Sequence, residues 1–153
     1  DELQSRASFP RGSSSARISA GIAGSAQSLS DPEEPVRGAA AFALADLSDW
    51  AEPAIPALIR ALDEPLGNDA LDWSSSARTG AAAALERIGS PAVPSLIDAL
   101  IAGSESRKTT ISTILVNIGP PAVPSVSKAL AEADSENGIH FQAILLLISA
   151  EQR

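Results

Sequence analysis

Apolar and small residues recur along this chain with the period of an α-helix. Between residues 17 and 151 they occupy positions i, i+3, i+4 and i+7 in eight successive segments, as at Ile55, Leu58, Ile59 and Leu62. This spacing places them on one face of an amphipathic helix. The segments are separated by short stretches rich in proline, glycine, serine and aspartate, which favour turns. The pattern therefore predicts an all-α protein.

The segments form pairs with a regular spacing. Leu85 and Leu115 are 30 positions apart and Leu115 and Leu145 are again 30 apart, whereas Leu44 and Leu85 are 41 apart because of two insertions. Two short helices cannot bury their apolar faces alone, so repeats of this length stack around one continuous core. The sequence predicts a right-handed α-α superhelix, or solenoid, of four helix pairs within residues 17–153. The approximate pairs are 17–47, 53–88, 91–118 and 121–151.

One motif repeats at the corners between pairs. The stretch IGSPAVPSLIDAL, which begins at Ile88, returns as IGPPAVPSVSKAL, which begins at Ile118. Gly89 and Gly119 directly follow the preceding helix, where a left-handed cap favours glycine. Proline in the first turn of the next helix sacrifices no hydrogen bond and presets φ. We therefore expect short, rigid corners.

The repeated segments resemble a known family. Stretches such as LSDPEEPVRGAAAFALADL (residues 29–47) and ARTGAAAALERIGSPAVPSLIDAL (residues 77–100) are similar to HEAT repeats of the phycobilisome-lyase-like subtype. The resemblance covers residues 17–149 and implies a HEAT-like solenoid that mediates protein-protein interaction. Because some proteins of this type act on bilin chromophores, it also implies an alternative role as a bilin-lyase-like or chromophore-handling protein.

The same resemblance implies a structural ladder. In such repeats an Asp of the turn and an Arg at the start of the second helix link successive repeats. The positions that match are Asp31 with Arg37 and Asp72 with Arg78. In the third repeat Lys108 holds the basic position without the Asp, and in the fourth Gly138 breaks the pattern. We expect the ladder to weaken toward the C-terminus.

Composition and charge narrow the function classes. Hydrophobic residues make up 44% of the chain and charged residues 20%, which is typical of a globular protein. A net charge of −8 argues against nucleic-acid binding, which requires clustered Lys and Arg. No apolar run reaches the length of a membrane helix, so no membrane insertion is expected. Because the chain lacks an initiator Met, cleavage of a leader is one explanation for Asp1. A secreted or cell-surface location is favoured over a cytoplasmic one, and a designed start is the alternative.

Candidate chemistry is sparse. The chain has no Cys, and His140 is its only imidazole, with no nucleophile or second base in the surrounding sequence. The loop that holds Asp63, Glu64, Asp69 and Asp72 is acidic but lacks the ligand order of an EF-hand, so a solvated loop is favoured over a calcium site. The sequence therefore predicts a non-enzymatic protein with no catalytic residue, no metal site and no cofactor.

Three aromatic residues are candidates for protein contacts. Trp50 and Trp73 lie in the two insertions, and Phe42 is at an outward position of a second helix. Exposed Trp often anchors protein interfaces. The alternative is that each Trp ring seals the core beneath its loop.

The two ends of the chain differ in character. Residues 1–16 form a polar, Ser-rich N-terminal arm whose anchors are expected to be Leu3 and Phe9; the arm could also fold back on the first helix. The last helix is apolar nearly all round and presents Ile139, Leu146 and Leu147 as candidate interaction residues. A head-to-tail contact between this helix and the small-residue N-terminal helix of another copy would propagate as a filament.

The sequence thus predicts a scaffold whose partner is protein, other copies of the chain included. Two alternatives to the filament stay open at this point. The chain could be part of a longer repeat array, or the N-terminal arm could cover one end of the solenoid.

Overall fold

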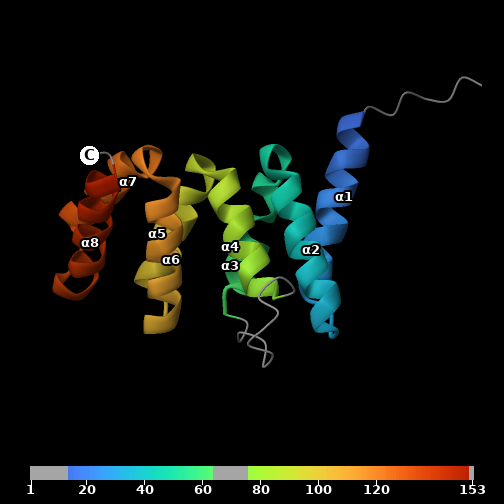
Figure 1. Ribbon diagram of the computed structural model, residues 1–153, viewed down its shortest axis with the longest axis horizontal. Helices are drawn as coiled ribbons and strands as arrows, with labels where there is room; N and C mark the ends of the chain where they lie inside the picture. Colours follow the sequence, from blue (N-terminus) through green and yellow to red (C-terminus); the bar gives the residue numbers. More distant parts are fainter. Residues whose placement is uncertain (1–13, 64–75, 152–153) are drawn as a thin grey trace, which may run out of the picture.

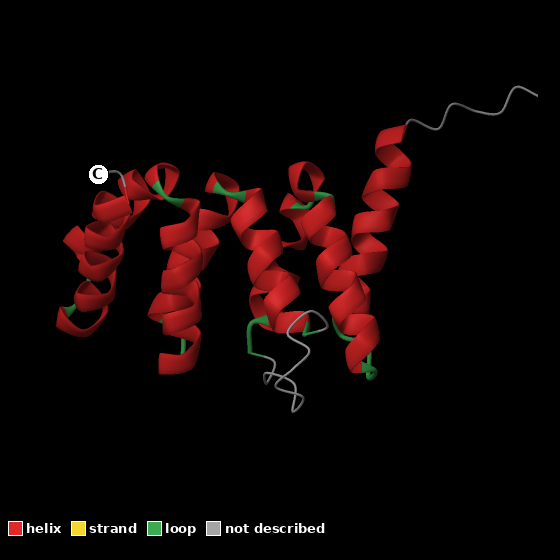
Figure 2. Cartoon of the chain, viewed as in Figure 1, coloured by secondary structure: helices red, strands yellow, loops and turns green. Residues whose placement is uncertain are grey.

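The computed structural model describes residues 14–63 and 76–151. Within these ranges the chain is an all-α solenoid of α-helices joined by tight corners, and no strand is present (Figure 2). The predicted fold class is therefore confirmed. Leu3, Phe9, Asp72 and Trp73 lie outside the described residues.

The helices follow one another in pairs along the stack (Figure 1). None of the described helices is long and apolar enough to cross a bilayer. In chain order the helices are α1 (Ser14–Ser28), α2 (Glu34–Asp46), α3 (Ile55–Ala61), α4 (Ala77–Ile88), α5 (Val93–Ile101), α6 (Glu105–Ile118), α7 (Val123–Glu132) and α8 (Ser135–Glu151). Helix α1 stands at one end of the stack and α8 at the other. Helix α1 begins at Ser14, before the periodic pattern starts at Arg17.

The corners have the geometry that the repeated motif predicts. Gly89 and Gly119 adopt φ values of 71° and 72°, a region that side-chain-bearing residues rarely visit. Each glycine is followed by a single 3₁₀ turn, η3 (Ser90–Ala92) or η4 (Pro120–Ala122), which leads directly into the next helix. Between α2 and α3, where the first insertion lies, two 3₁₀ turns stand in place of this glycine corner, η1 (Ser48–Trp50) and η2 (Glu52–Ala54).

One hydrophobic core runs through the whole stack. Every helix from α1 to α8 contributes buried apolar residues to it. Among the fully buried large side chains are Leu44, Leu58, Leu85, Leu96 and Phe141. Because these residues come from all four pairs, each repeat is stabilised by its neighbours, as expected for a solenoid.

The second helices α2 and α4 pack unusually closely. A Cβ atom built on Gly80 of α4 would lie 2.7 Å from the Cβ of Ala41 and 3.2 Å from the backbone N of Phe42. Such an approach is possible only where glycine faces alanine. The alanine-rich sequence of these two helices is thus the direct cause of their short separation.

Replacing Gly80 by alanine tests this contact. We expect Gly80→Ala to lower the free energy of unfolding by about 1 to 3 kcal/mol, since the new methyl group overpacks a rigid contact between two helix backbones. The matched control is Gly24→Ala in α1, where a Cβ would meet nothing within 4 Å. There alanine should raise stability by about 0.5 to 1 kcal/mol through helix propensity. Urea unfolding followed by circular dichroism measures both; equal stability of the two variants would contradict the close contact.

Candidate functional site

The second helices α2, α4, α6 and α8 form one row, and each packs against the next in the same register. At the first interface of the row Gly80 of α4 lies against Ala41 of α2. About one turn to either side of this contact, small buried residues continue along both helices, Gly38 and Ala45 on α2 and Ala77 and Ala84 on α4, and helical periodicity pairs them in the same order. The last interface joins Ser112 and Val116 of α6 to His140 and Ile144 of α8, which line one groove. The repeat spacings of 41, 30 and 30 positions carry Gly38, Ala41 and Ala45 onto Ile139, Gln142 and Leu146 of α8. We call these three residues of α8 the α8 face.

Basic side chains at the starts of the second helices tie successive repeats together. Arg78 of α4 reaches α6, where Nη2 donates to the Ser106 hydroxyl at 3.3 Å and to the Thr110 hydroxyl. At the equivalent position Lys108 of α6 reaches α8, where Nζ donates to the Glu136 carboxylate at 2.9 Å. In each case the first partner follows 28 residues after the basic residue. The two contacts therefore occupy equivalent positions in successive repeats, and each is one rung of a ladder.

The basic residue of the first pair, Arg37, also contacts the turn before its own helix. Arg37 Nη1 donates to the backbone carbonyl oxygens of Asp31 at 2.8 Å and of Pro32 at 3.0 Å. The Asp31 carboxylate accepts the backbone N–H of Glu33 at 2.9 Å. Both contacts stabilise the turn before α2. The ladder roles of Asp31, Arg37, Asp72 and Arg78 as a set remain a prediction, because Asp72 lies outside the described residues.

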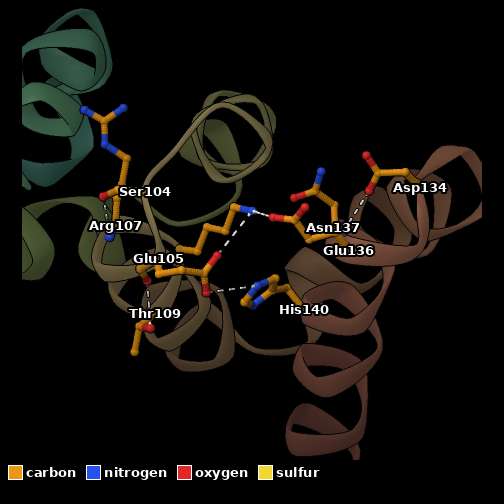
Figure 3. A network of polar contacts seen from close by, with 9 residues as sticks. Ser104, Glu105, Arg107, Thr109, Asp134, Glu136, Asn137 and His140 are labelled. Carbon is orange, nitrogen blue, oxygen red and sulfur yellow. Dashed lines mark hydrogen bonds and ion pairs between the residues drawn. The ribbon is translucent and has the colours of Figure 1, made fainter.

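Lys108 is the most elaborate rung. Its stem is almost fully buried, while Nζ lies 2.9 Å from Glu136 and 3.5 Å from Glu105 on the same helix. The hydrogen bond that Lys108 donates to Glu136 raises the pKa of Lys108 against the opposing effect of burial, and the charges of Glu136 and Glu105 add to the rise. Figure 3 shows Glu105 between this ammonium group and His140, whose Nε2 lies 3.8 Å from the other carboxylate oxygen.

A second set of polar contacts lies at the opposite ends of the same helices. Arg87 of α4 donates to the Asp46 carboxylate of α2 at 3.0 Å. Asn117 of α6, at the position that corresponds to Arg87, donates to Glu86 of α4 at 2.7 Å. The corresponding residue of α8 is Leu147. This set of contacts therefore ends in an apolar residue at the end of the row.

A groove separates α6 from α8. It has a volume of about 360 Å³, and its walls carry Thr113 and Val116 of α6 opposite His140, Ala143 and Leu147 of α8. The Thr113 hydroxyl donates to the backbone carbonyl of Thr109 at 3.1 Å, so it is engaged within its own helix. Because the walls are neutral and largely apolar, the groove suits an apolar side chain or a flat uncharged ligand better than a charged metabolite.

Three large apolar side chains of α8 are exposed. Ile139, Leu146 and Leu147 have exposed fractions of 68%, 65% and 54%. In the preceding second helix, Val116 occupies the position of Leu146 and is buried by α8. The exposure of Leu146 thus arises because no further second helix covers it within the described residues. Contiguous apolar exposure of this kind is typical of an interaction surface.

The other predicted contact residues are scattered. Trp50 is exposed in the corner η1 between the first two pairs, while Phe42 is half-buried on α2 beside α4. Neither lies on α8, so the structure does not gather the aromatic residues and the α8 residues into one site. The interaction roles of Phe42, Trp50, Trp73, Ile139, Leu146 and Leu147 remain predictions.

Sequence reasoning did not find the partners of Lys108. Glu105 could have been recognised from its i, i+3 spacing on one helix, which places two side chains on the same face. Glu136 could have been found only by applying the repeat register to the Arg78 contact. Another pair that was not anticipated is Asp63 with Arg107, which joins the acidic loop to α6. Within residues 14–63 and 76–151 no three His, Cys, Asp or Glu side chains gather as a metal site.

A comparison with family models identifies the repeats. The model of the PBS lyase HEAT-like repeat matches residues 36–64 and 77–101. Each match runs from a second helix through the corner into the following first helix, that is, over α2 and α3 and over α4 and α5. These two stretches are therefore HEAT-like repeats, as the resemblance implied. No curated protein and no solved structure matches it.

Substitutions of Lys108 separate the packing of its stem from its charge. Lys108→Met keeps an apolar stem and removes the ammonium group, whereas Lys108→Ala removes both. We expect Lys108→Ala to lower the urea midpoint more than Lys108→Met, because buried methylene groups are lost as well. The two variants should be compared with wild type at pH 8 by circular dichroism. Equal midpoints for the two variants would mean that the stem contributes nothing.

The pH dependence of the difference in urea midpoint between wild type and Lys108→Met tests the ion pairs of Lys108 with Glu136 and Glu105. Since the pKa of Lys108 is raised in the folded protein, its charge contributes stability that is fully present below about 10.5, the ordinary value for lysine. That contribution is lost as the pH rises through the higher pKa of the folded state. The difference in midpoint between wild type and Lys108→Met should therefore stay constant from pH 8 to 10 and shrink above it. A difference that grows above pH 10.5 would contradict the assignment.

Proposed function

We propose that this protein is a non-enzymatic HEAT-repeat scaffold that binds protein through α8 and assembles head to tail with copies of itself. The observation that carries the proposal is the exposure of Ile139, Leu146 and Leu147 on one helix. Burying a Leu or Ile side chain is worth about 1.5 to 3 kcal/mol, so covering these residues would supply a substantial part of a binding energy.

The described polar groups favour binding over catalysis. His140 pairs with Glu105, and the nearby Thr109 and Thr113 hydroxyls donate to backbone carbonyls of α6 at 2.9 and 3.1 Å. A nucleophile would instead need a base within hydrogen-bond reach. The arrangement therefore supports a structural role for His140.

Light scattering over a concentration series tests the proposal. We expect the mean mass of the wild-type protein to rise with concentration, and to rise further at moderate salt because salt screens the repulsion between copies of charge −8. Leu146→Asp should weaken the association about tenfold or more, since it removes apolar burial and places a charge in the contact.

The matched control for this experiment is Ile101→Asp. Ile101 is also an exposed large aliphatic residue, at 49%, but it lies at the end of α5 away from α8. This variant should associate as the wild type does. A constant monomer mass of the wild type at every concentration and salt level would contradict self-assembly, and equal losses in both variants would contradict the role of α8.

The groove between α6 and α8 favours one alternative, the handling of a bilin chromophore. Its neutral, mostly apolar walls and its volume of about 360 Å³ fall within the range of small-molecule sites. If this alternative holds, mixing the protein with a bilin shifts the visible absorbance of the pigment, and Ala143→Trp abolishes the shift by filling the groove. An unchanged spectrum with wild-type protein would exclude the alternative.

A further inference from the structure

We infer that the α8 face binds α2 of a second copy, so that the row of second helices continues across the joint in the register used within the chain. The inference rests on the proposed self-assembly and specifies its geometry. It identifies the partner as the first helix pair of a second copy and names the residues that meet.

The register follows from the interfaces already present. Within the chain, Ala41 of α2 faces Gly80 of α4 at a close contact between the two helices. The residue that corresponds to Ala41 in the last pair is Gln142, and the residue that corresponds to Gly80 in the first pair is Ala39. Continuing the stack therefore places Gln142 of one copy opposite Ala39 of the next.

The same shift generates the other two contacts. The pair Gly38 and Ala77 corresponds at the joint to Ile139 of one copy facing Val36 of the next. The pair Ala45 and Ala84 corresponds to Leu146 facing Ala43. The residues that these pairs derive from are buried within the chain. Their counterparts at the ends, Val36, Ala39 and Ala43 on one side and Ile139 and Leu146 on the other, are all exposed in the single copy.

The two ends complement each other in shape. The α8 face presents large side chains at Ile139 and Leu146, whereas Ala39 and Ala43 of α2 present small ones. Large residues of one helix pack into the spaces above small residues of its neighbour. Two α8 faces would instead bring large side chains against each other. The asymmetry therefore favours a heterologous contact, which propagates, over a two-fold dimer.

Charge does not oppose this joint. At the joint, the basic position of the ladder is Gly138 of one copy. The position of its partner, which is Ser106 or Glu136 within the chain, is Pro35 of the second copy. Neither ladder position therefore buries an unpaired charge. Asp46 of the second copy lies beside Leu146 in this register, as Asn117 lies beside Glu86 within the chain. Its carboxylate is already paired with Arg87 of its own chain at 3.0 Å.

Engineered cysteines test the register directly, because the natural chain contains no Cys. Gln142→Cys and isotopically labelled Ala39→Cys are mixed at a concentration where light scattering shows association and are then oxidised. Mass spectrometry should find the mixed disulfide several-fold enriched over both homodimers, since only the mixed pair brings the two sulfurs within bonding distance. The control mixture replaces Gln142→Cys with Ile101→Cys and should give little mixed product.

A chain with both Ala39→Cys and Gln142→Cys distinguishes a filament from a closed dimer. Under non-reducing conditions it should form a ladder of covalent multimers. A band at the dimer alone, or mixed product as abundant in the Ile101→Cys control, would overturn the inferred joint even though light scattering still shows self-assembly. A wild-type protein that stays monomeric in light scattering would instead overturn the proposed self-assembly on which the joint depends.

Discussion

The close contact between neighbouring second helices is the constraint from which most of this structure follows. At Ala41 and Gly80 the helices approach so closely that even one methyl group would overlap. Along the row the residues that correspond to Ala40 are Ala81, Ile111 and Phe141, all buried. Side-chain volume therefore increases toward the C-terminus. The small residues suit the close approach of α2 and α4, and the apolar groove lies between α6 and α8, where larger residues such as Val116 and Ile144 line the interface.

The polar contacts between repeats set register more than they set stability. Arg87 with Asp46 is an exposed ion pair, and such pairs contribute about 0 to 1 kcal/mol. These contacts matter because they fix the axial register of each second helix against the next. Contacts at both ends of the second helices, such as Arg78 with Thr110 and Asn117 with Glu86, permit only one sliding arrangement of each helix along the next. The apolar contacts between them, being non-directional, could tolerate several.

Much of this architecture could be predicted from sequence because it depends on local chemistry and on repetition. Gly89 and Gly119 signal their corners through the one backbone conformation that only glycine adopts readily. The pairing of the helices followed from the periodic recurrence of leucine. The Lys108 cluster could not be predicted in the same way, because Glu136 reaches it only through the packing of α6 on α8. We expected the ladder to weaken after Arg78. At Lys108, however, the Glu136 carboxylate takes the place of the hydroxyl groups that accept hydrogen bonds from Arg78.

The exposed apolar residues on α8 also gain their meaning from tertiary structure. An apolar helix in a sequence is consistent with a deeply buried element as well as with an interaction surface. Only the register of the row shows that Leu146 stands where Val116 is covered by the next helix. The basic position of the ladder is occupied by Gly138 in this helix, so α8 offers apolar burial without a charge at that position that would need a partner. A net charge of −8 works in the opposite direction, because long-range repulsion disfavours association of copies while leaving the short-range apolar contact unchanged. In the proposed assembly, the balance of these two terms makes association depend on concentration and ionic strength.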